Sequence, residues 1–375
     1  MLKVILTSNL YLPNIGGIEN SLRSLSEVGS ERGDNIFIIS SNIVDGGEHL
    51  ATDIEINGNV TIIRYNTKKS IESKFLSILY HMYSAIKCYA SIQNKEQYTV
   101  IARYHWNVIF AKIAGFNNIR YLVPGVVKYQ NNKDNTAKFN AISFKLECVI
   151  QSLALKLSKV YIFSESMKEQ LQSLKLKLEP IMVSPGIDQD RFRLVSREYT
   201  ENKVNLLILS RLVPAKGIDL AIKSLSYLPL NFTLDIVGDG PARGRLEHIV
   251  EELGLTSRVL FHPKTMTPET YYNNSDIFLL PSLYEPFGQT ILEASACGLP
   301  TVGFHKSIVD TSTNDILDCF GFYSNSLDEK SYADAILRAS KSLREIDTFR
   351  VDLRNYILEK YSWLKLYIEL VEVEK

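Results

Sequence analysis

Short apolar runs, each followed by a polar loop and then by helical spacing, recur along the chain. The clearest run is 277–280, which stops at a proline and predicts a buried parallel strand, because strands covered on both faces are apolar throughout. Apolar residues at helical spacing follow over 291–296, and a further strand is predicted at 301–304. The loop at 281–290 therefore lies at the carboxyl end of a parallel sheet, where open α/β sheets bind ligands.

The same pattern occupies both halves of the chain. Buried strands are predicted at 4–7, 36–39, 100–102, 161–163 and 181–183, and then at 204–209, 232–237 and 259–261. Strands that alternate with helices predict an α/β fold with two Rossmann-like doubly wound domains facing a central cleft. We place the first domain at 1–198 and the second at 199–355, with a turn-rich, charged linker leading to residue 202.

Length and composition agree with this division. A chain of 375 residues exceeds what one hydrophobic core holds, and 45% hydrophobic with 22% charged residues is typical of soluble globular proteins. The net charge is zero, but residues 1–198 hold about 24 Lys and Arg against about 18 Asp and Glu. The first half is therefore basic.

The four cysteines predict the compartment. Cys88, Cys148, Cys297 and Cys319 lie in apolar contexts without CxxC or Cys/His metal spacing, so we expect buried free thiols and a reducing environment. No apolar stretch approaches the roughly 18 residues that a membrane span needs. The sequence predicts a cytoplasmic protein.

Two carboxylates mark the loop after 277–280. If a helix begins near Phe287, its first unpaired amides point into the same space as Glu285. Carboxylates accept hydrogen bonds from sugar hydroxyls, and amides donate to phosphate, so this loop suits a sugar ligand that carries phosphate. Glu293 also has a simpler explanation, since an acid in an early helical turn complements the helix dipole.

Other candidate residues have similarly balanced interpretations. Gly16 and Gly17 follow the first strand and would let the backbone approach a ligand, although a tight turn explains them equally well. They do not form GxGxxG, which argues against a dinucleotide. His105 follows the strand at 100–102 and faces either the cleft or the protein interior.

Two stretches, 66–95 and 128–159, mix lysines with large apolar residues. Basic amphipathic helices of this kind can lie on an anionic membrane surface. The alternative is a pair of core-packing helices with solvated basic faces.

The order of several motifs resembles a known family. SRLVPAKG at 210–217, VGDGP at 237–241 and SDIFLLPSLYEPFGQTILEASACGLPTV at 275–302 are similar to the retaining glycosyltransferases of family 4, which have the GT-B fold and an E-x7-E motif. PNIGGIEN, VSPGIDQDRF and YSW extend the likeness over nearly the whole chain. The resemblance also implies that residues 356–375 form a helix that crosses back to the first domain.

The resemblance implies roles for individual residues. Arg211 and Lys216 would hold the diphosphate of a nucleotide sugar and stabilise its charge as it leaves. Glu293 would bind the ribose, and Glu285 would bind the transferred sugar. The remaining donor-binding positions are Gly16, Gly17, Gly238, Asp239, Gly240, Phe287, Gly288, Gln289 and Thr290.

The implied reaction retains the anomeric configuration, needs no metal or other cofactor, and uses a phosphate oxygen to take the proton of the acceptor. The partners would be a nucleotide sugar with UDP or GDP, a glycan or lipid-linked acceptor and an anionic membrane at the cytoplasmic face, but no nucleic acid. Two alternatives share the fold: a nucleotide-sugar epimerase or hydrolase, and a non-catalytic partner protein.

The chain departs from the family pattern at two places. Relatives carry a histidine after the strand that here spans 120–123, where this chain has Pro124 and Gly125, so either His105 substitutes or no histidine is used. After the strand at 301–304, Asp310 stands roughly where relatives have a glutamate.

Overall fold

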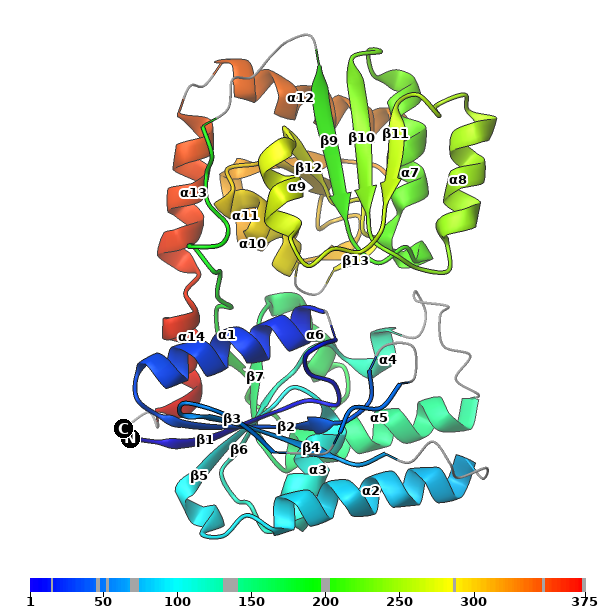
Figure 1. The fold of residues 1–375 in the computed structure, drawn as a ribbon. Helices are drawn as coiled ribbons and strands as arrows, with labels where there is room; N and C mark the ends of the chain where they lie inside the picture. The colour runs from blue at the N-terminus through cyan, green and yellow to red at the C-terminus, as the bar shows by residue number, and fades with distance from the viewer. Residues whose placement is uncertain are drawn as a thin grey trace.

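The computed structural model describes residues 1–14, 16–44, 48–51, 54–67, 74–130, 141–196, 203–285, 288–345 and 348–372 (Figure 1). The predicted boundary between residues 198 and 199 lies outside these ranges, as does Phe287.

The N-terminal domain, at the bottom of Figure 1, is built on a sheet in the order β3-β4-β2-β1-β5-β6-β7-β8. Every strand is parallel to its neighbours except β3, which is antiparallel to β4. The strands are β1 (Lys3–Thr7), β2 (Asn35–Ser41), β3 (Glu55–Asn57), β4 (Val60–Tyr65), β5 (Tyr98–Ala102), β6 (Ile119–Leu122), β7 (Lys159–Ile162) and β8 (Ile181–Met182).

Helices connect these strands as in other doubly wound sheets. They are α1 (Gly17–Glu31), α2 (Lys74–Ala90), α3 (His105–Ile113), α4 (Val127–Gln130), α5 (Ala141–Lys156) and α6 (Glu165–Gln172), with a 3₁₀ turn η1 at Lys95–Gln97. The helix α3 packs against both α2 and α5.

The C-terminal domain has a parallel sheet in the order β11-β10-β9-β12-β14-β16 and a separate β13-β15 pair. The strands are β9 (Val204–Leu209), β10 (Phe232–Val237), β11 (Val259–His262), β12 (Ile277–Leu279), β13 (Tyr284–Glu285), β14 (Thr301–Phe304), β15 (Asp310–Thr311) and β16 (Gly321–Ser324). The helices are α7 (Ile218–Ser224), α8 (Arg243–Glu252), α9 (Pro268–Asn274), α10 (Gln289–Ala296), α11 (Thr313–Leu317) and α12 (Glu329–Glu345), with 3₁₀ turns η2 (Pro214–Lys216), η3 (Leu225–Tyr227) and η4 (Asp318–Phe320).

The last two helices join the domains along one side of the molecule (Figure 1). The helix α13 (Phe349–Lys360) packs against α10 of the C-terminal domain, and α14 (Trp363–Val371) packs against α1 of the N-terminal domain. The chain therefore returns to the first domain near Ser362, where it forms a β-bridge with Ile187.

Burial explains the apolar runs of the sequence. Residues of β1, β5, β9 and β12 are almost wholly inaccessible to solvent, because helices cover both faces of each sheet. The strand patterns are therefore continuous rather than alternating.

The structure corrects two predictions. Only Cys297 of the four free cysteines is buried: Cys88 and Cys148 are partly buried and Cys319 is exposed. Burial raises the pKa of the Cys88 thiol to about 11 and that of Cys297 to about 12. The helix that was expected to begin near Phe287 begins instead at Gln289, with Gly288 as its N-cap.

Candidate active site

Two adjoining cavities lie between the domains. The first, of about 470 Å³, and the second, of about 530 Å³, are within the size range of small-ligand sites. Gly17 and Trp363 from the N-terminal side and Arg211 and Gln289 from the C-terminal domain line both cavities. A ligand that fills both would therefore pass these four residues.

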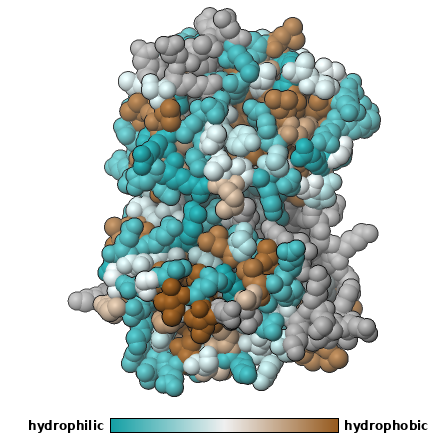
Figure 2. All heavy atoms as spheres, viewed as in Figure 1, coloured by the Kyte–Doolittle hydropathy of each residue, from teal (hydrophilic) through white to brown (hydrophobic). Residues whose placement is uncertain are grey.

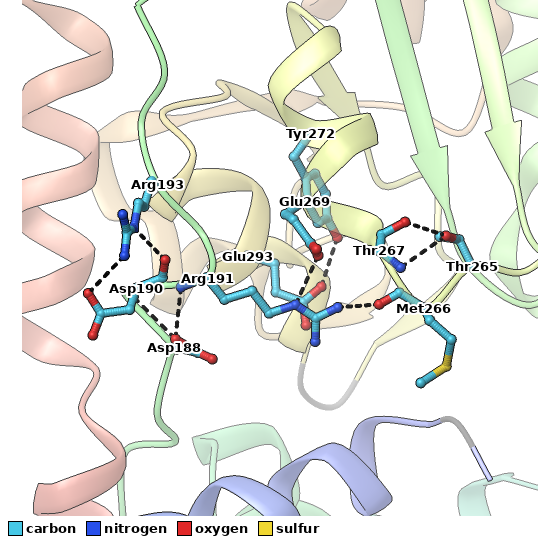
Figure 3. A network of polar contacts seen from close by, with 10 residues as sticks. All are labelled: Asp188, Asp190, Arg191, Arg193, Thr265, Met266, Thr267, Glu269, Tyr272 and Glu293. Atoms are coloured by element: carbon cyan, nitrogen blue, oxygen red, sulfur yellow. Dashed lines mark hydrogen bonds and ion pairs between the residues drawn. The ribbon is translucent and has the colours of Figure 1, made fainter. Parts of the chain in front are cut away.

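The first cavity contains Glu293, on α10. Its side chain is buried, and the hydroxyl of Tyr272 donates a hydrogen bond of 3.0 Å to its carboxylate (Figure 3). Burial raises the pKa of Glu293 to about 7, although the Tyr272 hydroxyl and the Arg191 guanidinium both lower it. The hydrogen bond from Tyr272 therefore fixes the position of the Glu293 carboxyl, while burial disfavours its charged form.

Arg191 extends across this cavity beside Glu293 (Figure 3). Its Nε lies 2.9 Å from the Glu269 carboxylate, and its guanidinium also donates to the backbone carbonyl of Met266. The Asp188 carboxylate accepts a hydrogen bond of 2.9 Å from the backbone amide of Arg191. These contacts fix the segment between the domains against the wall of the first cavity.

The second cavity contains an ion pair between Lys216 and Glu285. The Lys216 Nζ lies 2.6 Å from the Glu285 carboxylate, and the hydroxyl of Ser282 donates to the same oxygen at 3.3 Å. Glu285 is buried. Lys216 lies at the end of the 3₁₀ turn η2, which is followed by Gly217 with a φ of +59°. A Cβ at residue 217 would lie 2.1 Å from the Pro281 carbonyl oxygen, so only glycine fits there.

His105 lines the same cavity from the N-terminal domain. Its Nε2 lies 2.5 Å from the Glu147 carboxylate on α5, which also accepts hydrogen bonds of 3.1 Å from the Trp106 indole. Burial raises the pKa of Glu147, but the hydrogen bonds from His105 and Trp106 outweigh burial and lower that pKa below its ordinary value. Glu147 is therefore ionised at neutral pH and orients the imidazole.

The glycines after β10 have a packing role. A Cβ at residue 238 would lie 2.0 Å from the Ser210 carbonyl oxygen, and one at residue 240 would lie 2.3 Å from the Leu212 oxygen. The first cavity is also lined by Gly238, Asp239 and Gly240. The two glycines therefore allow the loop after β10 to approach the loop after β9, and the same loop forms part of the cavity wall.

The structure brings most of the residues singled out from the sequence to these two cavities. The first cavity is lined by Gly16, Gly17, Arg211, Gly238, Asp239, Gly240, Gln289, Thr290 and Glu293, and the second by Gly17, His105, Arg211, Lys216, Glu285 and Gln289. Gly288 precedes α10 but lies outside both linings, and Phe287 is outside the described residues.

Asp310 lies elsewhere. Its carboxylate accepts hydrogen bonds from Ser166 and Gln170 of α6, at 2.7 Å for Gln170, and lines neither cavity. In this structure it connects the two domains.

Several cavity residues had not been identified as site residues. Asn20 and Arg23 lie one turn or more into α1, where nothing in the local sequence separates them from a solvated helix face. Arg191 and Trp363, by contrast, lie in the VSPGIDQDRF and YSW motifs, which could have indicated them.

The chain is similar in sequence and in fold to known proteins. Residues 188–350 match the family model described as glycosyl transferases group 1. The chain is 24% identical to a component of the phosphatidylinositol N-acetylglucosaminyltransferase of Arabidopsis thaliana, over 96% of this chain and 79% of that protein. It is 28% identical to a GDP-mannose-dependent alpha-(1-6)-phosphatidylinositol monomannoside mannosyltransferase of Mycolicibacterium smegmatis, over 50% of this chain and 54% of that protein.

Among solved structures, sucrose-phosphate synthase of Thermosynechococcus elongatus superposes with a TM-score of 0.80 at 19% identity, covering 99% of this chain and 97% of that one. The fold is therefore GT-B, as expected. The family match covers less than half of the chain, and together with the named relatives it shows similarity to glycosyltransferases, which agrees with the resemblance to family 4.

Proposed function

We propose that the protein transfers a sugar from a UDP- or GDP-linked donor to a glycan or lipid-linked acceptor, in the synthesis of a surface polysaccharide, lipopolysaccharide or glycolipid. The observation that carries this proposal is the pair of joined cavities, one holding Glu293 and the other holding Lys216, Glu285 and His105. The names of the two relatives, which specify sugar transfer to phosphatidylinositol-type acceptors, support the choice of acceptor class.

In this proposal the nucleoside occupies the first cavity, with the ribose hydroxyls donating to Glu293. The diphosphate lies where the cavities meet, between Arg211 and Lys216, and the sugar enters the second cavity beside Glu285. Lys216 keeps its contact with Glu285 in this arrangement, because an ammonium group has three donors and the ion pair uses one of them.

The proposed reaction retains the anomeric configuration. The bond from the anomeric carbon to the diphosphate breaks and its electron pair goes to the phosphate oxygen, while the acceptor oxygen bonds to the same face of that carbon. The acceptor proton passes to a donor phosphate oxygen. Arg211 and Lys216 stabilise the negative charge of the leaving group, so we propose that no metal is required.

The experiment that tests this function measures binding first and turnover second. UDP or GDP near a hundred times its Kd should raise the melting temperature by about 3 °C, with no change on adding EDTA. Sugar should then leave the donor rapidly only when an acceptor is present. Rapid conversion of donor alone would support an epimerase or hydrolase, and no thermal shift with any nucleotide sugar would refute the proposal.

We further propose that His105 contacts the transferred sugar. Because Nε2 lies against the ionised Glu147 carboxylate, Nδ1 is the ring nitrogen that is left to bind a sugar hydroxyl. Glu147 is in this view a positioning residue: it touches the histidine and not the substrate.

Glu147→Gln is expected to lower kcat about tenfold, because the amide no longer enforces one imidazole tautomer. The donor KM and the melting temperature should change little, and His105→Ala should cost at least as much in kcat. Glu179→Gln, at an exposed site of the same domain, is the matched control. A wild-type kcat in Glu147→Gln would refute the positioning role.

We propose that the N-terminal domain contacts an anionic membrane at the cytoplasmic face, in keeping with the four unpaired cysteines. No described helix is both long and apolar enough to cross a bilayer. The helices α2 and α5 instead expose large apolar side chains. Separately from these helices, Figure 2 shows hydrophobic residues gathered on the face of this domain that is turned to the viewer. The exposed residues on the two helices are Leu76, Ile78, Leu79 and Tyr83, and Ile142, Leu146, Val149 and Leu153.

We propose this membrane contact in place of the alternative, in which the two helices pack on the core and keep solvated basic faces. Exposed Lys87, Lys145 and Lys156 accompany the apolar residues. We expect the protein to sediment with phosphatidylglycerol vesicles at low salt and not with phosphatidylcholine vesicles. Leu146→Ser combined with Val149→Ser should weaken sedimentation several-fold, and no sedimentation of the wild type at low salt would refute the contact.

A further inference from the structure

Arg103 is a buried cation in the wall of the second cavity. It follows β5 directly, at the carboxyl edge of the N-terminal sheet, and its side chain is 5% exposed. The guanidinium stacks 5.2 Å from the ring centre of Phe163, another lining residue, and donates a hydrogen bond of 3.3 Å to the Leu122 carbonyl. These contacts hold it in one orientation.

The charge of Arg103 is not balanced by a nearby acid. Within the described residues no carboxylate forms an ion pair with it, and its Nε has no hydrogen-bond partner. Two acids near this cavity contact other residues: Glu285 pairs with Lys216, and Glu147 contacts His105. Glu19 lines the same cavity and its charge raises the pKa of Arg103, but it forms no ion pair with Arg103.

Burial of an unbalanced cation is costly, and here it lowers the pKa of Arg103 to about 10. A hydrophobic side chain of similar size would stabilise this wall better. The position is therefore better explained by an anion that binds in the cavity than by the stability of the empty protein.

The neighbouring helix terminus adds positive potential at the same place. The helix α3 begins at His105 with Tyr104 as its N-cap, and the described residues provide no side-chain cap and no acid in the first turn. Tyr104 and His105 both line the second cavity. Unpaired amides at a helix N-terminus favour an anion.

We propose that Arg103 and the N-terminus of α3 bind an anionic group, a phosphate or a carboxylate, that the acceptor carries near the hydroxyl to be glycosylated. This inference rests on the proposed transferase function and specifies the class of its acceptor. Arg103 belongs to the N-terminal domain, whereas the donor diphosphate is assigned to Arg211 and Lys216 of the other domain. The two anions therefore have separate sites.

The test measures anion binding with the donor site filled. The protein is saturated with UDP or GDP and then titrated with inorganic phosphate or galacturonate at constant ionic strength, with chloride as the reference, while the melting temperature is followed. Phosphate or galacturonate should raise it further in the wild type. Arg103→Met should bind the anion at least about tenfold more weakly than the wild type. Arg103→Lys keeps the charge but not the planar guanidinium, so its affinity for the anion should lie between those of the wild type and Arg103→Met.

Arg120→Met is the matched control. Arg120 is an equally buried arginine on the adjacent strand β6, but its guanidinium donates to the carbonyls of Leu370 and Glu372, away from the cavities. This variant should be less stable yet keep the wild-type response to the anion. If Arg103→Met does not fold, Arg103→Lys alone decides the test.

Two further probes distinguish the source of the anion. Binding of myo-inositol 1-phosphate without binding to phosphatidylinositol vesicles would indicate a soluble acceptor, and vesicle binding that Arg103→Met weakens would indicate a lipid headgroup. Two results would refute this inference alone, provided that the nucleotide raises the melting temperature normally. In one, the anion does not change the melting temperature of the wild type; in the other, it changes those of the wild type and both Arg103 variants equally. Absence of the nucleotide shift itself would refute the proposed function.

Discussion

Glu293→Ala is expected to lower kcat/KM for the nucleotide sugar at least about a hundredfold, because two ribose hydroxyls lose a charged acceptor. Binding of the free nucleoside diphosphate should weaken by a similar factor, which titration calorimetry would measure. Glu251→Ala, at an exposed position of α8, is the control and should bind normally. Normal nucleotide affinity in Glu293→Ala would contradict the placement of the ribose.

The same carboxylate should make stability depend on pH. Its pKa is about 7 in the folded protein against an ordinary value near 4.5, so between these two values the folded state binds more protons than the unfolded chain. The free energy of unfolding therefore falls as pH rises from about 4.5 to about 7, by up to about 3 kcal/mol from this group.

Glu293→Gln cannot ionise and should escape this loss. It should unfold at a higher temperature than the wild type at pH 8 and at nearly the same temperature at pH 4.5, while losing donor affinity. Equal melting temperatures at pH 8 would show that the carboxyl is not destabilised by burial. A gain in stability with a loss of function is typical of residues retained for binding.

Lys216→Ala is expected to lower kcat about a thousandfold, because the leaving diphosphate loses a donor that acts as charge develops. The structure adds an effect that the sequence did not reveal: removing Lys216 leaves the buried Glu285 without its partner at 2.6 Å. Stability should fall by about 2 to 3 kcal/mol, measured by denaturant unfolding.

A double variant separates the two effects. Lys216→Met combined with Glu285→Gln removes both charges, so it should recover much of the stability and none of the activity. Lys223→Ala should leave both unchanged, since among the described residues this lysine makes only a long, exposed contact of 3.8 Å with Glu329. Activity in the double variant would contradict the role assigned to Lys216.

The fold was predictable because parallel strands buried on both faces leave uninterrupted apolar runs. Strands such as β9, β10 and β12 were found within a residue or so of their ends. The strand β3 was missed, because all three of its residues are exposed and the run is short.

The candidate site was predictable where a loop follows a strand, since topology brings such loops to one edge. Arg211, Glu285 and His105 are of this kind. The partners of these residues were not predictable: Glu147 is 42 positions from His105, and its carboxylate lies in an ordinary helical stretch. Asp310 was placed by analogy of position, but its carboxylate accepts hydrogen bonds from Ser166 and Gln170 of α6, on the other domain.

The most direct test of the central claim is a crystal structure of the protein with the nucleoside diphosphate, UDP or GDP, that raises its melting temperature more. The account predicts ribose hydroxyls within hydrogen-bond distance of the Glu293 carboxylate and a diphosphate between Arg211 and Lys216. A nucleotide bound outside the two joined cavities, or one whose phosphates point away from Lys216, would contradict it.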